Sequence, residues 1–314
     1  MFEEKIAKLI QLTEQGILTE KELLDTVKSI SKDVKEHASS PFNKGLDYEL
    51  VFRDGTLGYE VSKGDCNDCY TVIIENTYRG LPVIAIAECG FDYCSKLHDI
   101  ELPDSLLYIG DGAFSGCFNL ENIELQYTRL TQIGCEAFLG CNSLKTITLP
   151  RTVKCIKDGA LCNCDSLNAV VFLGKELEKI PDSFCSNCNC LSLVSLEYTN
   201  IEEIGYGAFS KCTSLKKVHL PATLKKIRKY AFEECRNLEE LAIDINYERW
   251  NKIEKEDGWN RDVPSFNLRF IDCEITVEKG EVYLYSEKWL KDKLAMNPHP
   301  SIKEQIIKQY LENN

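Results

Sequence analysis

The segment from Ile109 to Gln132, IGDGAFSGCFNLENIELQYTRLTQ, is followed directly by a second version of itself, IGCEAFLGCNSLKTITLPRTVKC, from Ile133 to Cys155. The shared pattern is I-x-x-x-A-F-x-x-C-x-x-L-x-x-I-x-L-P, and it starts seven times, at Ile86, Ile109, Ile133, Ile156, Ile180, Ile204 and Ile227. The steps between starts are 23, 24, 23, 24, 24 and 23 residues. A near-constant period of this length indicates a solenoid in which each repeat forms one coil.

Each repeat divides into a strand and a turn. The L-x-x-I-x-L part alternates as a half-buried strand does, for example at Leu120, Ile123 and Leu125, and the proline that often follows ends the strand because it has no amide hydrogen to donate. The I-x-x-x-A-F-x-x-C part predicts a short helical turn with its aromatic residue and its cysteine facing inward. One copy cannot bury its own apolar face, so we expect the copies to stack at about 4.8 Å into a parallel sheet.

These repeats resemble the BspA-type leucine-rich repeats, and the resemblance covers about residues 46–280. Upstream, YELVFRDGTLGYEV (residues 48–61) and GLPV (residues 80–83) resemble the β-rich segment that leads into the first repeat of that family. Downstream, Trp250, Trp259 and Cys273 match its closing segment. The resemblance implies an α/β solenoid, a leucine-rich repeat with a parallel β-sheet on its concave face and a β-rich N-terminal cap.

Two repeats depart from the pattern. Leu161 stands in the fourth repeat where phenylalanine is usual. In the fifth, Phe184 and Cys185 replace the usual Ala-Phe pair. This is a one-residue slip, and we expect it to distort that turn.

Both ends of the chain have helical spacing. Residues 1–40 predict a helical hairpin, broken at Gly16, in which Thr19 and Glu22 form a capping box. The hairpin resembles the SHOCT motif, which implies a docking element or homo-oligomer contact; the alternative is a generic hairpin that caps the solenoid. The predicted division is a hairpin (1–40), the β-rich cap (41–85), seven repeats (86–245), the closing segment (246–280) and a helical tail (281–314).

Composition excludes several classes of protein. The chain has 314 residues, 44% of them hydrophobic, and a formal charge of −13, which disfavours binding to nucleic acid because phosphate contacts need clustered Lys and Arg. No apolar run reaches about 18 residues, so we expect no membrane insertion. The start, MFEEKIAKLI, lacks the apolar core of a secretion signal, which predicts a cytoplasmic protein. An extracellular or cell-surface location is the alternative if a leader has been removed.

The 16 cysteines fall into two groups. Seven occupy the same repeat position, eight residues after the starting Ile: Cys94, Cys117, Cys141, Cys164, Cys188, Cys212 and Cys235. We interpret these as small buried fillers. The others include the C-x-x-C pair Cys66 and Cys69 and a set near Cys162, Cys185 and Cys190, which leave a metal or redox function open. No metal ligand set or cofactor is predicted from them.

The side chains between the buried strand positions point outward and can be followed from coil to coil. The first coils present Glu101 and Glu124, the middle coils present Ala169, Val171 and Leu193, and the sixth presents Lys217 and His219. Nearby Lys225, Lys226, Arg228 and Lys229 are expected to extend the positive charge onto the turn. Exposed apolar residues on an outward face are informative, so Val171 and Leu193 are predicted to centre a partner-binding surface between an acidic and a basic wing.

No catalytic arrangement is recognisable. The four histidines are scattered, and neither a zinc-protease helix motif, a nucleophile elbow nor a phosphate loop is present. The sequence therefore predicts a noncatalytic scaffold that binds a protein partner through the sheet. The alternatives are a cysteine-based metal or redox protein, and an adhesion or host-interaction protein if a leader has been removed.

Overall fold

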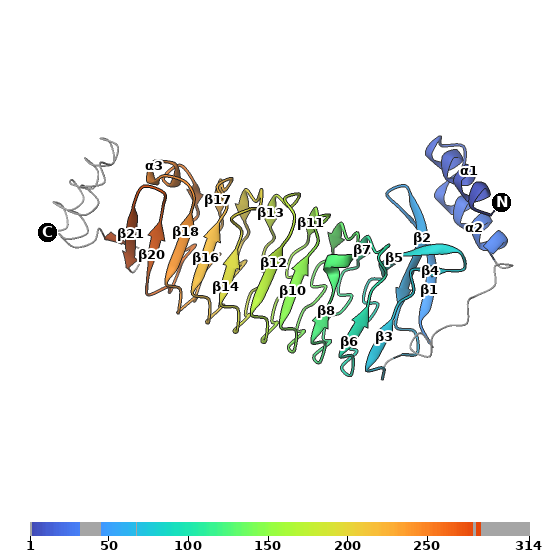
Figure 1. The fold of residues 1–314 in the computed structure, drawn as a ribbon, viewed down its shortest axis with the longest axis horizontal. Helices are drawn as coiled ribbons and strands as arrows, with labels where there is room; N and C mark the ends of the chain where they lie inside the picture. The colour runs from blue at the N-terminus through green and yellow to red at the C-terminus, as the bar shows by residue number, and fades with distance from the viewer. Residues whose placement is uncertain (1, 32–44, 67, 279–280, 284–314) are drawn as a thin grey trace.

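The computed structural model describes residues 2–31, 45–66, 68–278 and 281–283, which form one elongated solenoid (Figure 1). Its coils follow one another along the long axis, with helices α1 (Phe2–Glu14) and α2 (Glu20–Ser31) beside the first coils. The predicted fold, a leucine-rich-repeat solenoid of parallel strands behind a β-rich cap, is confirmed. Within the described residues, no helix has the length and apolar character needed to cross a bilayer.

The longer strand of each coil lies in a parallel sheet on one side of the solenoid, which we call the broad sheet. Its spatial order is β10 (Thr146–Leu149), β12 (Ala169–Phe172), β14 (Leu193–Ser195), β16 (Lys217–Leu220), β18 (Glu240–Ile243), β20 (Ser265–Arg269), β21 (Glu274–Glu278) and β22 (Glu281–Tyr283). The last two strands run antiparallel and close the C-terminal end. The first two coils pair separately, as β3 (Thr71–Ile73), β6 (Asp99–Glu101) and β8 (Asn122–Ile123).

A second set of strands carries most of the repeat-start isoleucines. One sheet joins the cap to the first coils through β1 (Asp47–Arg53), β2 (Thr56–Ser62), β5 (Leu81–Ile86), β7 (Tyr108–Ile109), β9 (Gln132–Ile133) and β11 (Cys155–Ile156), with β4 (Thr77–Tyr78) beside β5. The other, which we call the narrow sheet, contains β13 (Lys179–Ile180), β15 (Glu203–Ile204), β17 (Lys226–Ile227) and β19 (Glu254–Lys255). β19 adds a coil beyond the seventh repeat, with Lys255 in register with Ile227.

The A-F-x-x-C segment forms hydrogen-bonded turns, so the predicted helical turn is wrong. The Phe114 amide donates to the Ala137 carbonyl of the next coil (2.7 Å), whereas the Ser115 amide donates within its own coil, to Gly112 (3.0 Å). A helix would direct all these amides back along its own axis. Alternation between the two directions instead needs left-handed backbone at Gly112 and Gly116, whose φ angles are 61° and 72°.

The core is a set of stacked rows, one residue from each coil. Phe91, Phe114 and Phe138 are fully buried and stack with ring centroids 5.6 and 5.3 Å apart. The seven cysteines at the common repeat position form a parallel row and are all buried, as predicted. Because every coil contributes the same residue types, neighbouring coils complete one another's core.

The row of cysteines has a polar role that packing alone does not explain. From the second repeat onward, the thiol of each of these cysteines donates a hydrogen bond to a backbone carbonyl of the preceding coil, at 3.0–3.3 Å. The pairs are Cys117 to Phe91, Cys141 to Phe114, Cys164 to Phe138, Cys188 to Leu161, Cys212 to Cys185 and Cys235 to Phe209. A buried carbonyl has two lone pairs, so a thiol fills both an apolar gap and an acceptor site.

The fifth repeat keeps its register, so the predicted distortion is wrong. The Cys185 amide donates to the Ala208 carbonyl (2.8 Å), as the phenylalanine amide does in other coils. Phe184 occupies the alanine position and is buried, with its ring 6.3 Å from Phe209 and 6.2 Å from Phe172. The missing phenylalanine at position 161 and the small Cys185 leave the volume that Phe184 fills.

The ends of the solenoid are covered differently. Leu23 and Val27 of α2 are fully buried and α2 packs on β1, while the capping box forms as predicted, with the Thr19 amide donating to Glu22 (2.9 Å). The SHOCT resemblance and a homo-oligomer contact remain predictions. At the other end, α3 (Tyr247–Trp250) precedes β19. The predicted helical tail begins as strand β22, and residues 284–314 lie outside the described residues.

We expect alkaline pH to destabilise the protein through the buried thiols. Burial raises the pKa of Cys117 and Cys235 to about 12, and that of Cys141 and Cys212 well above the ordinary 9.0. A thiol whose pKa is higher in the folded state than in the unfolded state makes its full contribution to stability below the unfolded-state pKa. This contribution is lost as the pH rises from there toward the folded-state pKa. Each thiol should therefore lower the free energy of unfolding by about 1.4 kcal/mol per pH unit above about pH 9.

Denaturant unfolding of the reduced protein across this pH range measures the effect. Cys141→Ala is the control, because it removes one titrating thiol and should make the pH dependence shallower by about one proton. Identical pH slopes for the wild type and this variant would contradict the expectation.

Candidate functional site

The strands of the broad sheet lie side by side (Figure 1), so residues in register form rows across neighbouring strands. Ala169 is in register with Leu193, and Leu193 with Lys217. Val171 and His219 occupy the equivalent place in the adjacent row, with Ser195 between them. The structure therefore brings five of the seven predicted partner-binding residues together on β12, β14 and β16.

The other two predicted residues, Glu101 and Glu124, are exposed but lie outside the broad sheet. Glu101 ends β6, and Glu124 precedes a single 3-10 turn, η2 (Leu125–Tyr127). Gln126 stands where neighbouring coils have proline, and the Thr128 hydroxyl donates to the Leu125 carbonyl (2.7 Å), which stabilises this turn. The strand pairing is interrupted here, and the acidic wing formed by these two residues stays a prediction.

An apolar patch lies at the centre of the broad sheet. The exposed fractions of Val171, Leu173 and Leu193 are 41%, 44% and 51%. Leu173 was not among the predicted site residues, although it follows Val171 by two positions and therefore points to the same side of the strand. Between Val171 and Leu173, the Phe172 side chain packs on the core instead.

Acidic side chains reach the sheet next to the patch. The Nδ1 atom of His219 lies 3.3 Å from Glu197, and Arg269 lies 3.5 Å from Glu240. Lys217 is exposed between Leu193 and Glu240 in register. The apolar patch is thus bordered on the β16–β18 side by charges of both signs.

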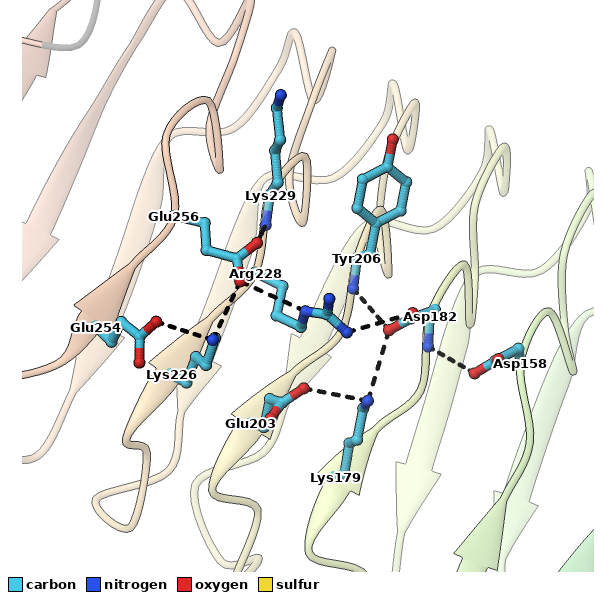
Figure 2. Close-up of polar contacts among 10 residues, drawn as sticks. All are labelled: Asp158, Lys179, Asp182, Glu203, Tyr206, Lys226, Arg228, Lys229, Glu254 and Glu256. Carbon is cyan, nitrogen blue, oxygen red and sulfur yellow. Dashed lines mark hydrogen bonds and ion pairs between the residues drawn. The ribbon is translucent and has the colours of Figure 1, made fainter.

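Of the four basic residues predicted to extend this charge, three are matched by acids on a different surface. Lys226 pairs with Glu254 (2.8 Å) and Glu256 (3.1 Å) across the narrow sheet, and Lys225 pairs with Glu202 (2.6 Å). Figure 2 shows that Arg228 lies between Glu256 and Asp182, at 3.6 and 3.5 Å. The predicted basic extension is therefore wrong, because each of these three cations is compensated within the solenoid.

Asp182 is the centre of this network (Figure 2). Its Oδ1 atom accepts a hydrogen bond from the Tyr206 amide of the next coil (2.9 Å) and faces Lys179 (3.6 Å). Its own amide donates to Asp158 of the preceding coil (3.1 Å). Asp111 bonds the Cys135 amide in the same way (2.8 Å), so carboxylates at this repeat position link coil to coil. We assign this surface a structural role.

The cysteines outside the ladder do not assemble a metal site. Cys66 and Cys69 form a disulfide in the cap. Of the second set, Cys185 is buried in the core, Cys162 is half-buried and Cys190 is exposed. Among the described residues, the one group of three ligand atoms that converges is Glu197, His219 and Asp244, which contains no cysteine.

Comparison with known proteins agrees with this architecture. The model of the family described as BspA type Leucine rich repeat region matches six copies over residues 66–192 and 178–254, together more than half of the chain. A leucine-rich repeat protein from Bacteroides ovatus is 22% identical, with a TM-score of 0.50, and the match covers 75% of this chain and 77% of that one. The T. pallidum leucine-rich repeat protein TpLRR is 26% identical, with a TM-score of 0.48 and coverage of 73% and 91%. No curated protein matches.

We expect Asp182→Ala to destabilise the solenoid by about 1–2 kcal/mol, because the Tyr206 amide loses its acceptor and two cations lose a partner. Asp182→Asn keeps an acceptor oxygen but removes the charge, so it should cost less, and its effect should shrink in high salt. Urea unfolding at low and high ionic strength measures both. Equal stability of the wild type and Asp182→Ala would show that the network does not hold the coils together.

Proposed function

The chain belongs to the BspA-type leucine-rich-repeat family, and we propose that it is a noncatalytic scaffold that binds a protein partner through the broad sheet. The observation that carries this proposal is the exposed patch of Val171, Leu173 and Leu193 on the broad sheet. Membership of a repeat family suggests an interaction or surface scaffold, and an exposed apolar patch is a feature of interaction surfaces.

Rigidity supports this use of the sheet. The strands that carry the patch are hydrogen-bonded on both sides, β12 to β10 and β14, and β14 to β12 and β16. Beneath them, Val170, Val194 and Val218 are buried in one row. A surface held in this way loses little conformational entropy on binding, so more of the contact free energy appears as affinity.

The chemistry of the patch describes the partner. Two aliphatic side chains on β12 and just beyond its end, and one on β14, present an exposed apolar centre, which suits apolar side chains on a matching protein surface. Lys217 borders Leu193 and is placed to meet a carboxylate at the rim of such a contact. The proposal needs no bound cofactor and no catalytic group.

We expect Val171→Asp and Leu193→Asp each to weaken partner binding by about 2 kcal/mol, or roughly thirtyfold in Kd, because a charge is buried against apolar atoms. Proteins captured from the native cell by the wild type should be lost with both variants. Binding is then measured with each purified partner.

Ile271→Asp is the matched control, since Ile271 is also an exposed aliphatic residue (69%) but lies beyond β20, away from the patch. It should bind the partner as the wild type does. If both patch variants also bind the purified partner with unchanged affinity, the broad sheet is not the binding surface.

A further inference from the structure

Three potential metal ligands from three successive coils meet beside the apolar patch. Glu197 follows β14, His219 lies within β16 and Asp244 follows β18. One ligand atom of each residue lies within 4.8 Å of the other two, and Glu197 Oε2 and His219 Nδ1 are 3.3 Å apart. Four-coordinate zinc, with bonds of about 2.0–2.2 Å, separates its ligands by about 3.4 Å, so this spacing suits a shared cation.

The repeat register explains why these residues meet. Glu197 and Asp244 are each three residues beyond the central buried residue of their strand, Val194 and Leu241, so they lie in one row two coils apart. The coil between them has Pro221 at that position, which offers no ligand atom. His219, two residues earlier and on the same side of the strand, fills the gap between the two carboxylates.

The group has an excess of negative charge. Within the described part of the chain, His219 is the one ion-pair partner of Glu197, and Asp244 forms no ion pair with a Lys or Arg side chain. Elsewhere on the solenoid, acids such as Asp182 and Glu256 meet Lys or Arg. Here two carboxylates converge on an imidazole.

We propose that Glu197, His219 and Asp244 bind a divalent transition-metal cation, with Zn²⁺ as the best fit. Imidazole nitrogen with two carboxylate oxygens is a donor set that zinc and its first-row neighbours accept, whereas Ca²⁺ and Mg²⁺ prefer oxygen alone. Glu197 and His219 are about three-quarters shielded from solvent, and the exposed Asp244 completes the set. Three protein ligands leave further coordination positions open toward solvent.

This site goes beyond the proposed scaffold function and does not depend on it. The cation would stand on the broad sheet, with His219 in the same row as Val171 and Ser195. It would add a positive charge where the solenoid now has a local excess of carboxylates. The Cys66–Cys69 pair and the buried thiols take no part in it.

The test is metal titration of the full chain with Co²⁺ and Zn²⁺, after reduction of the thiols. The wild type should bind one equivalent of metal at this site. The variants His219→Gln and Asp244→Asn should bind that equivalent at least about tenfold more weakly. Because cysteines also bind these metals, the Co²⁺ absorption spectrum identifies the ligands. The equivalent lost in the variants should have d–d bands without thiolate charge-transfer absorption.

His98→Gln is the matched control, because His98 also faces a glutamate on the solenoid surface (Glu121, 4.0 Å), but Lys145 neutralises that acid at 2.7 Å. It should bind metal as the wild type does. Circular dichroism checks the fold of each variant, and Asp244→Asn changes only an exposed side chain. Equal stoichiometry and affinity in the wild type and Asp244→Asn, or a spectrum due to thiolate alone, would overturn the proposal.

Discussion

At the inner turn of each coil, a buried backbone carbonyl accepts a hydrogen bond from the thiol of the next coil, and the rest of the solenoid depends on this contact. Six successive thiols make it, from Cys117 to Cys235. The contact requires a side chain small enough for the turn, apolar enough for the core and able to donate one hydrogen bond, which cysteine satisfies. It adds to the backbone hydrogen bonds that join neighbouring coils at the same turns, such as that from the Phe114 amide to the Ala137 carbonyl.

Much of this architecture could be predicted from the sequence because it repeats. The period, the strand positions and the buried row of cysteines follow from one pattern read seven times. Features that depend on contacts between coils could not be read in the same way. The turn around Phe114 is not helical because its amide bonds to Ala137 of the next coil, and no local propensity reports such a bond. The fifth repeat keeps its register because Phe184 packs in the core of a region where Leu161 and Cys185 replace the larger phenylalanine.

In the candidate site, too, local features could be predicted from the sequence and features that depend on several coils could not. Val171 and Leu193 could be predicted as exposed because strand alternation is local. The same alternation could have predicted that Leu173 is exposed. The repeat pattern does not report the break in strand pairing at η2, so the separation of Glu101 and Glu124 from the broad sheet was missed. The convergence of Glu197, His219 and Asp244 requires an alignment of three coils position by position, which a search for ligand spacing along the chain does not make.

The two surfaces of the solenoid therefore differ in how their side chains are used. On the narrow sheet, carboxylates and cations satisfy one another and neighbouring amides, which holds the coils in register. On the broad sheet, a rigid frame presents an apolar patch next to the three converging residues Glu197, His219 and Asp244, and both proposals concern this face.

Thiol labelling of the native, reduced protein, followed cysteine by cysteine with mass spectrometry, tests the central structural claim most directly. The exposed Cys89, Cys155 and Cys190 should react at once, whereas the ladder cysteines from Cys117 to Cys235 should react only as their coils unfold. Added denaturant should therefore accelerate labelling of the ladder in step with unfolding. Reaction of the ladder cysteines at the rate of Cys89 under native conditions would contradict the account.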